Sequence, residues 1–98
     1  MNICLLTARV IESPKRIFHN NQYLTEFTIS FPHLKKKLCC TTVICSGKMS
    51  QEAFDLYYLG DYIILEGRLL IKKSPNQKFK LVIKIINLHP AHIFINKW

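Results

Sequence analysis

Apolar and polar residues alternate along most of this 98-residue chain, and a period of two is the pattern of β-strands. The first half contains three such segments, over residues 3–11, 23–31 and 38–45. In the second segment Phe27, Ile29 and Phe31 fall on one face. Residues 15–22 contain Asn20-Asn21, a turn signal, and are predicted to be a turn region. The first half of the chain is therefore predicted to form three strands.

A short helix is predicted to follow the third strand. Its predicted range is residues 51–59, with Ser50 as the N-cap and Gly60 as the C-terminal stop. Three apolar residues in this range share one helix face by their spacing: Ala53, Leu56 and Tyr57. The pattern thus indicates a short helix that packs one side against the strands.

Two further strands complete the predicted fold. The fourth covers residues 62–73, and the fifth follows a hairpin loop at residues 74–77 and ends at Pro90. Gly67 interrupts the fourth strand and indicates a bulge, which small barrels need in order to close. Residues 93–98 are predicted as a short edge strand.

Three strands, one short helix and a two-stranded hairpin are the element order of an OB-fold. An SH3-like barrel usually lacks the helix, and an immunoglobulin-type sandwich needs about seven strands. The chain is therefore predicted to be all-β: a five-stranded OB-fold barrel with one short helix between strands 3 and 4. Its length predicts a single domain over residues 1–98.

Composition adds a strong positive charge to this picture. Fourteen Lys and Arg residues against six Asp and Glu residues give a net charge of +8, which favours a polyanionic partner. The longest apolar runs are a few residues, so no membrane span is predicted. The N-terminus has no basic segment before its apolar stretch, and it is interpreted as a first strand rather than a signal or transit peptide.

Basic residues gather on the last two predicted strands. Arg68 and Lys72 share the outer face of the fourth strand. Lys78, Lys80 and Lys84 share one face of the fifth. Antiparallel pairing through the hairpin loop would join the two rows into one basic strip, which can follow a phosphate backbone without reading its sequence. The alternative is a solvated sheet face on which lysines prevent edge pairing.

Aromatic side chains are the second feature that single-strand binding requires, because bases stack on them. The candidates are Phe18, Tyr23, Tyr62, Phe79 and Trp98. Four others are predicted to be core residues: Phe27, Phe31, Phe54 and Tyr57. Phe79 is also assigned to the core, because it lies on the apolar face of its strand. Tyr62, on an outer face, and Phe18, in a predicted loop, are the preferred stacking residues.

No catalytic, metal or cofactor site is predicted. The chain has no nucleophile elbow, phosphate-binding glycine loop or paired-carboxylate motif, and no small-molecule substrate is predicted. His89 and His92 provide a two-ligand spacing only, and the adjacent Cys39 and Cys40 point to opposite faces of a strand. Together with Cys45, these two cysteines are predicted to be small buried hydrophobic residues.

The order of these segments resembles the bacterial-type single-stranded DNA-binding (SSB) protein family. The resemblance begins with Asn2 and the first strand, and it is strongest over residues 43–69. The matching features there are Gly47, the helix with Ala53, the turn Tyr58-Leu59-Gly60 and the strand Ile64-Leu65-Glu66-Gly67-Arg68-Leu69. Within the family, the chain is most similar to the short SSB-like proteins encoded in algal plastid genomes and found in cyanobacteria.

The resemblance implies an OB-fold, sequence-independent binding of single-stranded DNA and a role in DNA replication, repair or recombination. It also implies a homo-oligomer, either a dimer or a tetramer. Together with a bias toward residues that have AT-rich codons, it implies a plastid (chloroplast) location or the cytoplasm of a cyanobacterium-like cell. Three positions where the family often has large aromatic residues fall near Cys40, Ser46 and Ser74, and none of these three residues is aromatic. Binding is therefore expected to depend mainly on charge.

The first hypothesis is a non-enzymatic single-stranded DNA binder in which basic residues hold the phosphates. The predicted contacts are Arg9, Lys35, Lys36, Lys37, Arg68, Lys72, Lys78, Lys80 and Lys84, with Tyr62 and Phe18 for stacking. The alternative is a non-catalytic OB-fold module for protein–protein interaction, with itself or a replication partner, that has little affinity for DNA. RNA binding is a third hypothesis, because such a groove separates RNA from DNA poorly without contacts to the 2′-hydroxyl.

Overall fold

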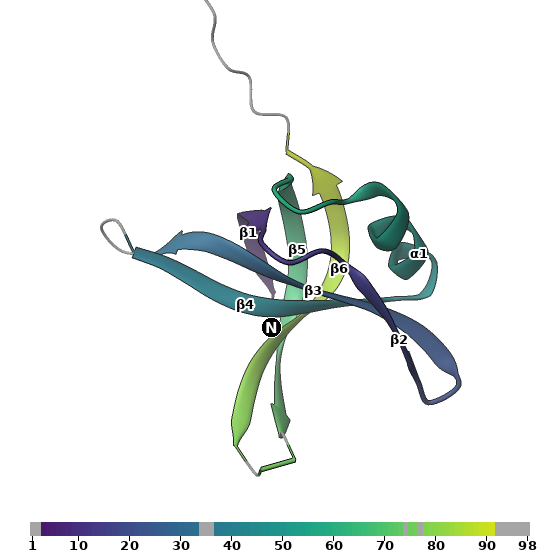
Figure 1. Cartoon of the computed structure of the whole chain (residues 1–98). Coiled ribbons are helices and arrows are strands. Elements are labelled where there is room, and N and C mark those ends of the chain that lie inside the picture. Colours follow the sequence, from purple (N-terminus) through teal and green to yellow (C-terminus); the bar gives the residue numbers. More distant parts are fainter. Residues whose placement is uncertain (1–2, 34–36, 74, 77, 92–98) are drawn as a thin grey trace, which may run out of the picture.

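The computed structural model describes residues 3–33, 37–73, 75, 76 and 78–91 (Figure 1). Over these residues the chain forms six strands and one helix: β1 (Cys4–Val10), β2 (Lys15–His19), β3 (Gln22–His33), β4 (Lys37–Ser46), α1 (Gly47–Leu56), β5 (Tyr62–Lys73) and β6 (Phe79–Pro90). The predicted all-β class, with one helix before the last two strands, is confirmed. The described part contains no helix with the length and apolarity needed to span a bilayer.

The strands form one sheet in the order β1-β5-β6-β4-β3-β2. β1 also pairs with β3, at Arg9–Ser30 and Val10–Ile29, so the sheet closes on itself. β4 and β6 pair in parallel over three positions, and the other pairs are antiparallel. Figure 1 shows the hairpins β2–β3, β3–β4 and β5–β6 extending in different directions from this closed body. We call the end of this last hairpin, residues 68–73 of β5 and 79–84 of β6, the β5–β6 arm.

The core is made of the side chains that point into the closed sheet. Its buried members are Ala8, Val10, Phe27, Ile29, Val43, Cys45, Ala53, Tyr57, Ile63, Leu65, Ile83 and Ile85. Alternate residues of the strands supply most of this set, as a period of two requires. Each large side chain removed from water stabilises the fold by about 1.5–3 kcal/mol. The predictions of Phe27 and Tyr57 as core residues are confirmed.

The segment predicted as a turn at residues 15–22 is mostly a strand. β2 pairs with β3 from Lys15–Glu26 to His19–Gln22, and only Asn20 and Asn21 form the turn. Both asparagines have positive φ, 50° and 61°. A two-residue turn of this kind matches the twist of its flanking strands, so the residues before it can pair with those after it. Over the described residues, the sheet therefore has six strands rather than the predicted five.

The helix begins four residues earlier and ends three residues earlier than predicted. Ser46 is the N-cap, although its side chain makes no capping hydrogen bond. Tyr57 is the C-cap, and its φ of −112° and ψ of 138° are extended. Gly60 does not end the helix; it lies in the following turn with φ of 94°, and its N–H donates to the carbonyl oxygen of Val10 at 2.7 Å.

Ser50, which the sequence predicted as the N-cap, is instead a buried residue inside α1. The hydroxyl of Thr25 on β3 lies 2.8 Å from the Ser50 hydroxyl and donates to the Ser50 carbonyl oxygen at 2.6 Å. Both side chains are fully buried. This pair fixes α1 against β3, because a buried polar group is stable only when it has a hydrogen-bond partner.

Replacing Thr25 with valine should destabilise the protein by about 1–3 kcal/mol, because the Ser50 hydroxyl would stay buried without its partner. Urea denaturation measures the change. Thr28→Val on the same strand is the matched control: its hydroxyl bonds the exposed Glu12, which can turn to water. The double variant with Thr25→Val and Ser50→Ala should be less destabilised than Thr25→Val alone. Equal losses for Thr25→Val and Thr28→Val would contradict the role of the buried pair.

Several residues predicted to be buried are exposed. Phe79 and Phe54 have exposed side chains, and Phe31 is only partly buried against the core. Cys45 is buried as predicted, whereas Cys40 is exposed. Phe79 is exposed because its strand pairs with β4 only from Val82 onward, so nothing among the described residues covers the start of β6 from the body of the sheet. Near the tip of the β5–β6 arm, the inward face therefore has no layer of described residues opposite it.

The bulge predicted at Gly67 is confirmed. Glu66 is opposite Asn87 but Gly67 is opposite Ile85, so β6 has one extra residue at this point. A Cβ on Gly67 would lie 2.5 Å from Cγ2 of Ile83 and 2.7 Å from the carbonyl oxygen of Lys84. β5 can cross β6 this closely only without a side chain. The hairpin turn predicted at residues 74–77 is present at residues 75–76, while Ser74, Gln77 and the predicted edge strand at 93–98 lie outside the described residues.

Candidate nucleic-acid interface

The β5–β6 arm places four cations on one face. Arg68 is opposite Lys84 and Lys72 is opposite Lys80, and directly opposed residues of an antiparallel pair share a face. All four side chains are exposed. We call these four residues the basic strip. The predicted joining of the two rows of basic residues is thus confirmed, and opposed like charges repel each other unless an anion lies between them.

Two other lysines extend the charge of the arm. Lys78 precedes β6, is exposed and continues the alternation of Lys80 and Lys84. Lys73 is opposite Phe79 at the far end of the arm and lies on the other face. The arm therefore carries cations along its length and on both faces near its tip.

The basic strip continues onto the neighbouring strands. β4 and β6 pair at Thr42–Val82, Val43–Ile83 and Ile44–Lys84, which puts Lys84 beside Ile44. Ile44 is in turn opposite Glu26 of β3. The residues of these two strands that share this outward face are Leu24, Glu26, Thr28, Ser30, Cys40, Thr42, Ile44 and Ser46, of which Ser30 and Thr42 are buried. The strip and this outward face of β3 and β4 form one curved surface.

Two hollows lie at the two ends of the short β4–β6 ladder. The smaller, of about 190 Å³, is lined by residues that include Leu24, Ile44, Leu70 and Lys84. The larger, of about 540 Å³, lies where the strands diverge, and we call it the β4–β6 groove. Its lining is Thr28, Phe31, Cys39, Cys40, Thr41, Thr42, Phe79, Lys80 and Leu81. An extended chain lying along the surface would pass over both hollows.

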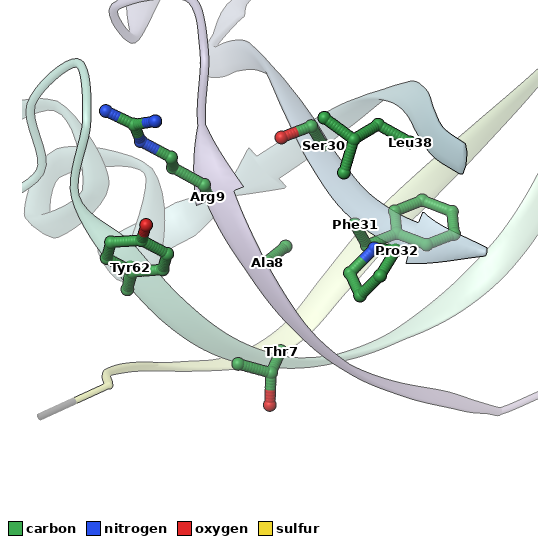
Figure 2. A pocket seen from close by; sticks show the side chains of 8 residues that line it. All are labelled: Thr7, Ala8, Arg9, Ser30, Phe31, Pro32, Leu38 and Tyr62. Atoms are coloured by element: carbon green, nitrogen blue, oxygen red, sulfur yellow. The ribbon is translucent and has the colours of Figure 1, made fainter. Parts of the chain in front are cut away.

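Arg9 and Tyr62 lie at a different place. They line a pocket of about 380 Å³ with Phe31 and Leu38, between the diverging ends of β1 and β3 (Figure 2). The Arg9 guanidinium carbon is 5.6 Å from the centre of the Tyr62 ring, a cation–π contact. Tyr62 and Arg68 are six positions apart on β5, or about 20 Å of strand. The structure therefore brings these two predicted residues to each other but not to the basic strip.

Phe18 is also separate from the basic strip. It lies on β2 rather than in a loop, and its ring is 5.0 Å from that of Tyr23 in an edge-to-face arrangement. The Arg16 guanidinium carbon is 4.7 Å from the centre of the Tyr23 ring and 5.9 Å from that of Phe54 on α1. Arg16 also donates a hydrogen bond to the side chain of Gln51. Phe18 thus belongs to a cluster on the α1 side of the β2–β3 hairpin.

Sequence reasoning missed this aromatic–arginine cluster because it treated residues 15–22 as a turn. Arg16 and Phe18 are two residues apart, so the strand pattern alone would have put them on one face.

Three of the remaining predicted residues, Lys35, Lys36 and Trp98, lie outside the described residues, as does His92. Lys37 is the first residue of β4 and is opposite His33.

The titratable residues give no sign of reaction chemistry in the described part. Burial raises the pKa of the Cys45 thiol to about 12, so it stays protonated at neutral pH and is a poor nucleophile. No group of three or more His, Cys, Asp or Glu side chains within the described ranges is placed to hold a metal ion. What the surface offers is cations, threonine hydroxyls and apolar side chains, which suit binding.

Comparison with solved structures supports the fold described above. No protein-family model matches the chain, and no curated protein matches its sequence. Among solved structures, the SSB domain of a Synechococcus protein is similar, with 28% sequence identity and a TM-score of 0.77 over 91% of this chain and 94% of that one.

Two further structures show the same fold at lower identity. They are a small single-stranded DNA-binding protein from Streptomyces coelicolor (13% identity, TM-score 0.79, 91% of each chain) and the second single-stranded DNA-binding protein of Mycobacterium smegmatis (17% identity, TM-score 0.74, 91% of this chain and 87% of that one). The predicted OB-fold and the predicted resemblance to the SSB family are confirmed by these neighbours.

Proposed function

We propose that this chain binds single-stranded DNA without sequence preference, through the basic strip and the adjoining outward face of β3 and β4. The observation that carries the proposal is the register of β5 and β6, which gathers Arg68, Lys72, Lys80 and Lys84 on one exposed face. Lysine and arginine contacts to phosphates fix a nucleic acid in place but carry no sequence information. The description of all three similar structures as SSB or single-stranded DNA-binding proteins supports the same ligand.

The proposal extends to the setting of this activity. We infer a non-enzymatic role in DNA replication, repair or recombination, in a plastid or in the cytoplasm of a cyanobacterium-like cell. The residue bias of the chain and its similarity to a Synechococcus domain support that setting. The chain is proposed to act as a homo-oligomer, dimer or tetramer, and the exposed Leu5 and Ile64 on the outer face of the β1–β5 pair support self-association.

Titration of labelled oligo-dT by fluorescence anisotropy tests the proposal. Binding should be tight at low salt, and the logarithm of the affinity should fall linearly with the logarithm of salt, by about 0.7 per phosphate neutralised. Duplex DNA of the same length should compete more weakly, and an oligo-U competitor measures the preference between DNA and RNA. Absence of oligo-dT binding at low salt would overturn the proposal.

The alternative function is a non-catalytic protein–protein interaction module. It is favoured by exposed aliphatic side chains away from the basic strip, of which Leu5 and Leu38 are about 70% exposed (72% and 70%). Under this alternative, replacing Leu5 and Leu38 with serine changes the assembly state, and replacing Lys78, Lys80 and Lys84 with alanine leaves the DNA affinity as it was. Light scattering, with and without oligo-dT, separates the two functions.

A further inference from the structure

Strand β2 has an open side. It is the last strand in the sheet order, so it pairs with β3 on one side and with no strand of the described residues on the other. His19 and Gln22 close the two-residue turn, and such a closing pair exchanges both of its backbone hydrogen bonds. Because this bonding alternates along the strand, Arg16 and Phe18 direct their N–H and C=O groups away from β3. An extended chain can pair with these groups as a further strand.

The side chains of the same two residues lie in an exposed apolar cluster. The aromatic–arginine cluster consists of Arg16, Phe18, Tyr23 and Phe54, where the β2–β3 hairpin extends from the closed body beside α1 (Figure 1). Its three rings are exposed by 60%, 55% and 42%, in chain order. Exposed rings forgo the stabilisation that burial would give, and several together mark an interaction surface. The open backbone and the apolar cluster therefore coincide on β2.

The charge of this edge is positive. Lys15, Arg16 and His19 are basic, and β2 contains no acidic residue. Glu26 is opposite Lys15 and offsets that charge. The Arg16 guanidinium, in contrast, donates to the neutral side chain of Gln51, and its buried Nε has no hydrogen-bond partner among the described residues. The matching partner therefore carries a carboxylate close to an apolar side chain.

A single strand of nucleic acid fits this edge less well than a peptide does. The Arg16 guanidinium carbon lies 4.7 Å from the centre of the Tyr23 ring, and the Phe18 ring meets that ring edge-to-face. A stacked base needs a free ring face, and these contacts cover part of the rings. A nucleic acid also lacks the alternating N–H and C=O groups that pair with a strand edge. A peptide has them.

A second copy of the chain fits less well for reasons of charge. If two β2 strands paired antiparallel about Ile17, the Arg16 residues of the two copies would be two positions apart, or about 7 Å along the ladder. That separation is within about one Debye length, 8–10 Å in physiological salt, so the two charges would repel each other. An acidic strand has the opposite charge and is attracted by the same residues.

We propose that the open side of β2 binds an extended acidic segment of a partner protein. The segment adds to the sheet as an antiparallel strand, with a carboxylate beside Arg16 and an apolar side chain against Phe18 and Tyr23. In strand addition, main-chain hydrogen bonds give affinity and side-chain contacts give specificity. β2 is three positions from β6 in the sheet order, so this inference goes beyond DNA binding by the basic strip and does not depend on it.

A capped peptide, Glu-Phe-Val-Glu-Glu, is the probe. In antiparallel register its second residue is opposite Phe18 and its fourth is opposite Arg16. Titrated into the ¹⁵N-labelled protein, it should shift the backbone amide signals of Arg16 and Phe18 most. A peptide with lysine in place of each glutamate should bind roughly tenfold more weakly, because it repels the basic edge. Equal binding of the two peptides, or no shift at these amides at millimolar peptide, would overturn the proposal.

Methylation of the peptide backbone tests the added strand itself. The N–H groups of the second and fourth peptide residues face β2, and that of the third faces away. Methylating the second and fourth nitrogens should weaken binding by roughly 5- to 150-fold, because two hydrogen bonds are lost. Methylating the third nitrogen is the control and should change binding by less than about twofold. If both methylated peptides bound equally well, the peptide would not be an added strand.

A protein variant tests the contribution of the cluster. Phe18→Ser should weaken binding of the acidic peptide by roughly 2- to 5-fold, which is the effect of one cross-strand pair. The matched control is Phe79→Ser, because Phe79 is also an exposed phenylalanine but lies on β6, and its loss should leave peptide binding unchanged. Both side chains are exposed, so both variants should remain folded, and thermal melting checks that they do.

Two outcomes with Phe18→Ser would assign the edge to another occupant. Loss of oligo-dT affinity with unchanged peptide binding would identify the cluster as a nucleic-acid contact. Loss of self-association by light scattering, again with unchanged peptide binding, would identify a contact between copies of the chain. Either result overturns the proposal, whether or not the wild type binds oligo-dT.

Discussion

Replacing all four residues of the basic strip with alanine is expected to lower the salt slope of oligo-dT binding by about 2.8, which is about 0.7 for each phosphate that is no longer neutralised. On the log–log plot the lines of the variant and the wild type meet at 1 M salt, so at 0.1 M salt this change of slope corresponds to an affinity lower by roughly 600-fold. The reason is geometric: Arg68–Lys84 and Lys72–Lys80 are opposed pairs on one face, so all four can reach the same backbone. Anisotropy titrations at several salt concentrations measure both quantities.

A single substitution elsewhere controls for the change in net charge. Lys15→Ala on the edge strand β2 removes the same charge as Lys80→Ala, away from the arm. Lys80→Ala should lower the slope by about 0.7, and Lys15→Ala should leave it nearly unchanged. If both variants lowered the slope equally, net charge rather than the strip would determine binding. The four strip side chains are exposed, so each change should alter the stability by less than about 0.5 kcal/mol.

The basic strip could be predicted from the sequence because every step toward it is local. Lys80 and Lys84 are four positions apart, an even spacing, so they share a face of any strand. The short connection at residues 74–77 makes β5 and β6 a hairpin, and a hairpin determines which residues are opposed. Neither step requires knowledge of the rest of the fold.

Phe79 could not be placed correctly by the same reasoning. Alternation identifies the face on which a residue lies, but it does not identify what lies opposite that face. Phe79 and Ile83 share a face of β6, yet Phe79 is 74% exposed and Ile83 is 2% exposed. The difference comes from the parallel pairing of β4 with β6 and from the closed sheet behind Ile83, both of which join distant parts of the chain.

The separation of Arg9 and Tyr62 from the strip has the same origin. Their contact depends on the register of β1 against β5, in which Arg9 is opposite Tyr62 across more than fifty residues of sequence. The position of Phe18 required something different, namely recognition that Asn20 and Asn21 together form a two-residue turn. Non-local register and turn geometry, rather than hydrophobic pattern, therefore account for the site residues that the sequence misplaced.

Replacing Gly67 with alanine is expected to destabilise the protein by about 1–3 kcal/mol, and Gly67→Val should destabilise it further. The new Cβ would lie 2.5 Å from Cγ2 of Ile83 and 2.7 Å from the carbonyl oxygen of Lys84. Ile83 is buried and β-branched, so it has little freedom to rotate away. The carbonyl oxygen belongs to the backbone of β6, so the strand itself would have to move. Urea denaturation measures the loss.

The neighbouring exposed residue provides the control, since Arg68→Ala should change the stability by less than about 0.5 kcal/mol. A destabilisation of Gly67→Ala no larger than that of this control would mean that β5 and β6 can separate here without penalty.

Gly67→Ala should also affect binding, because Gly67 is where the two strands cross closely before they continue into the arm that carries Arg68 and Lys84. Displacement of the Lys84 backbone would alter its position beside Ile44, so folded Gly67→Ala should bind oligo-dT more weakly than the wild type. The same close crossing that stabilises the closed sheet thus holds the basic strip beside β4.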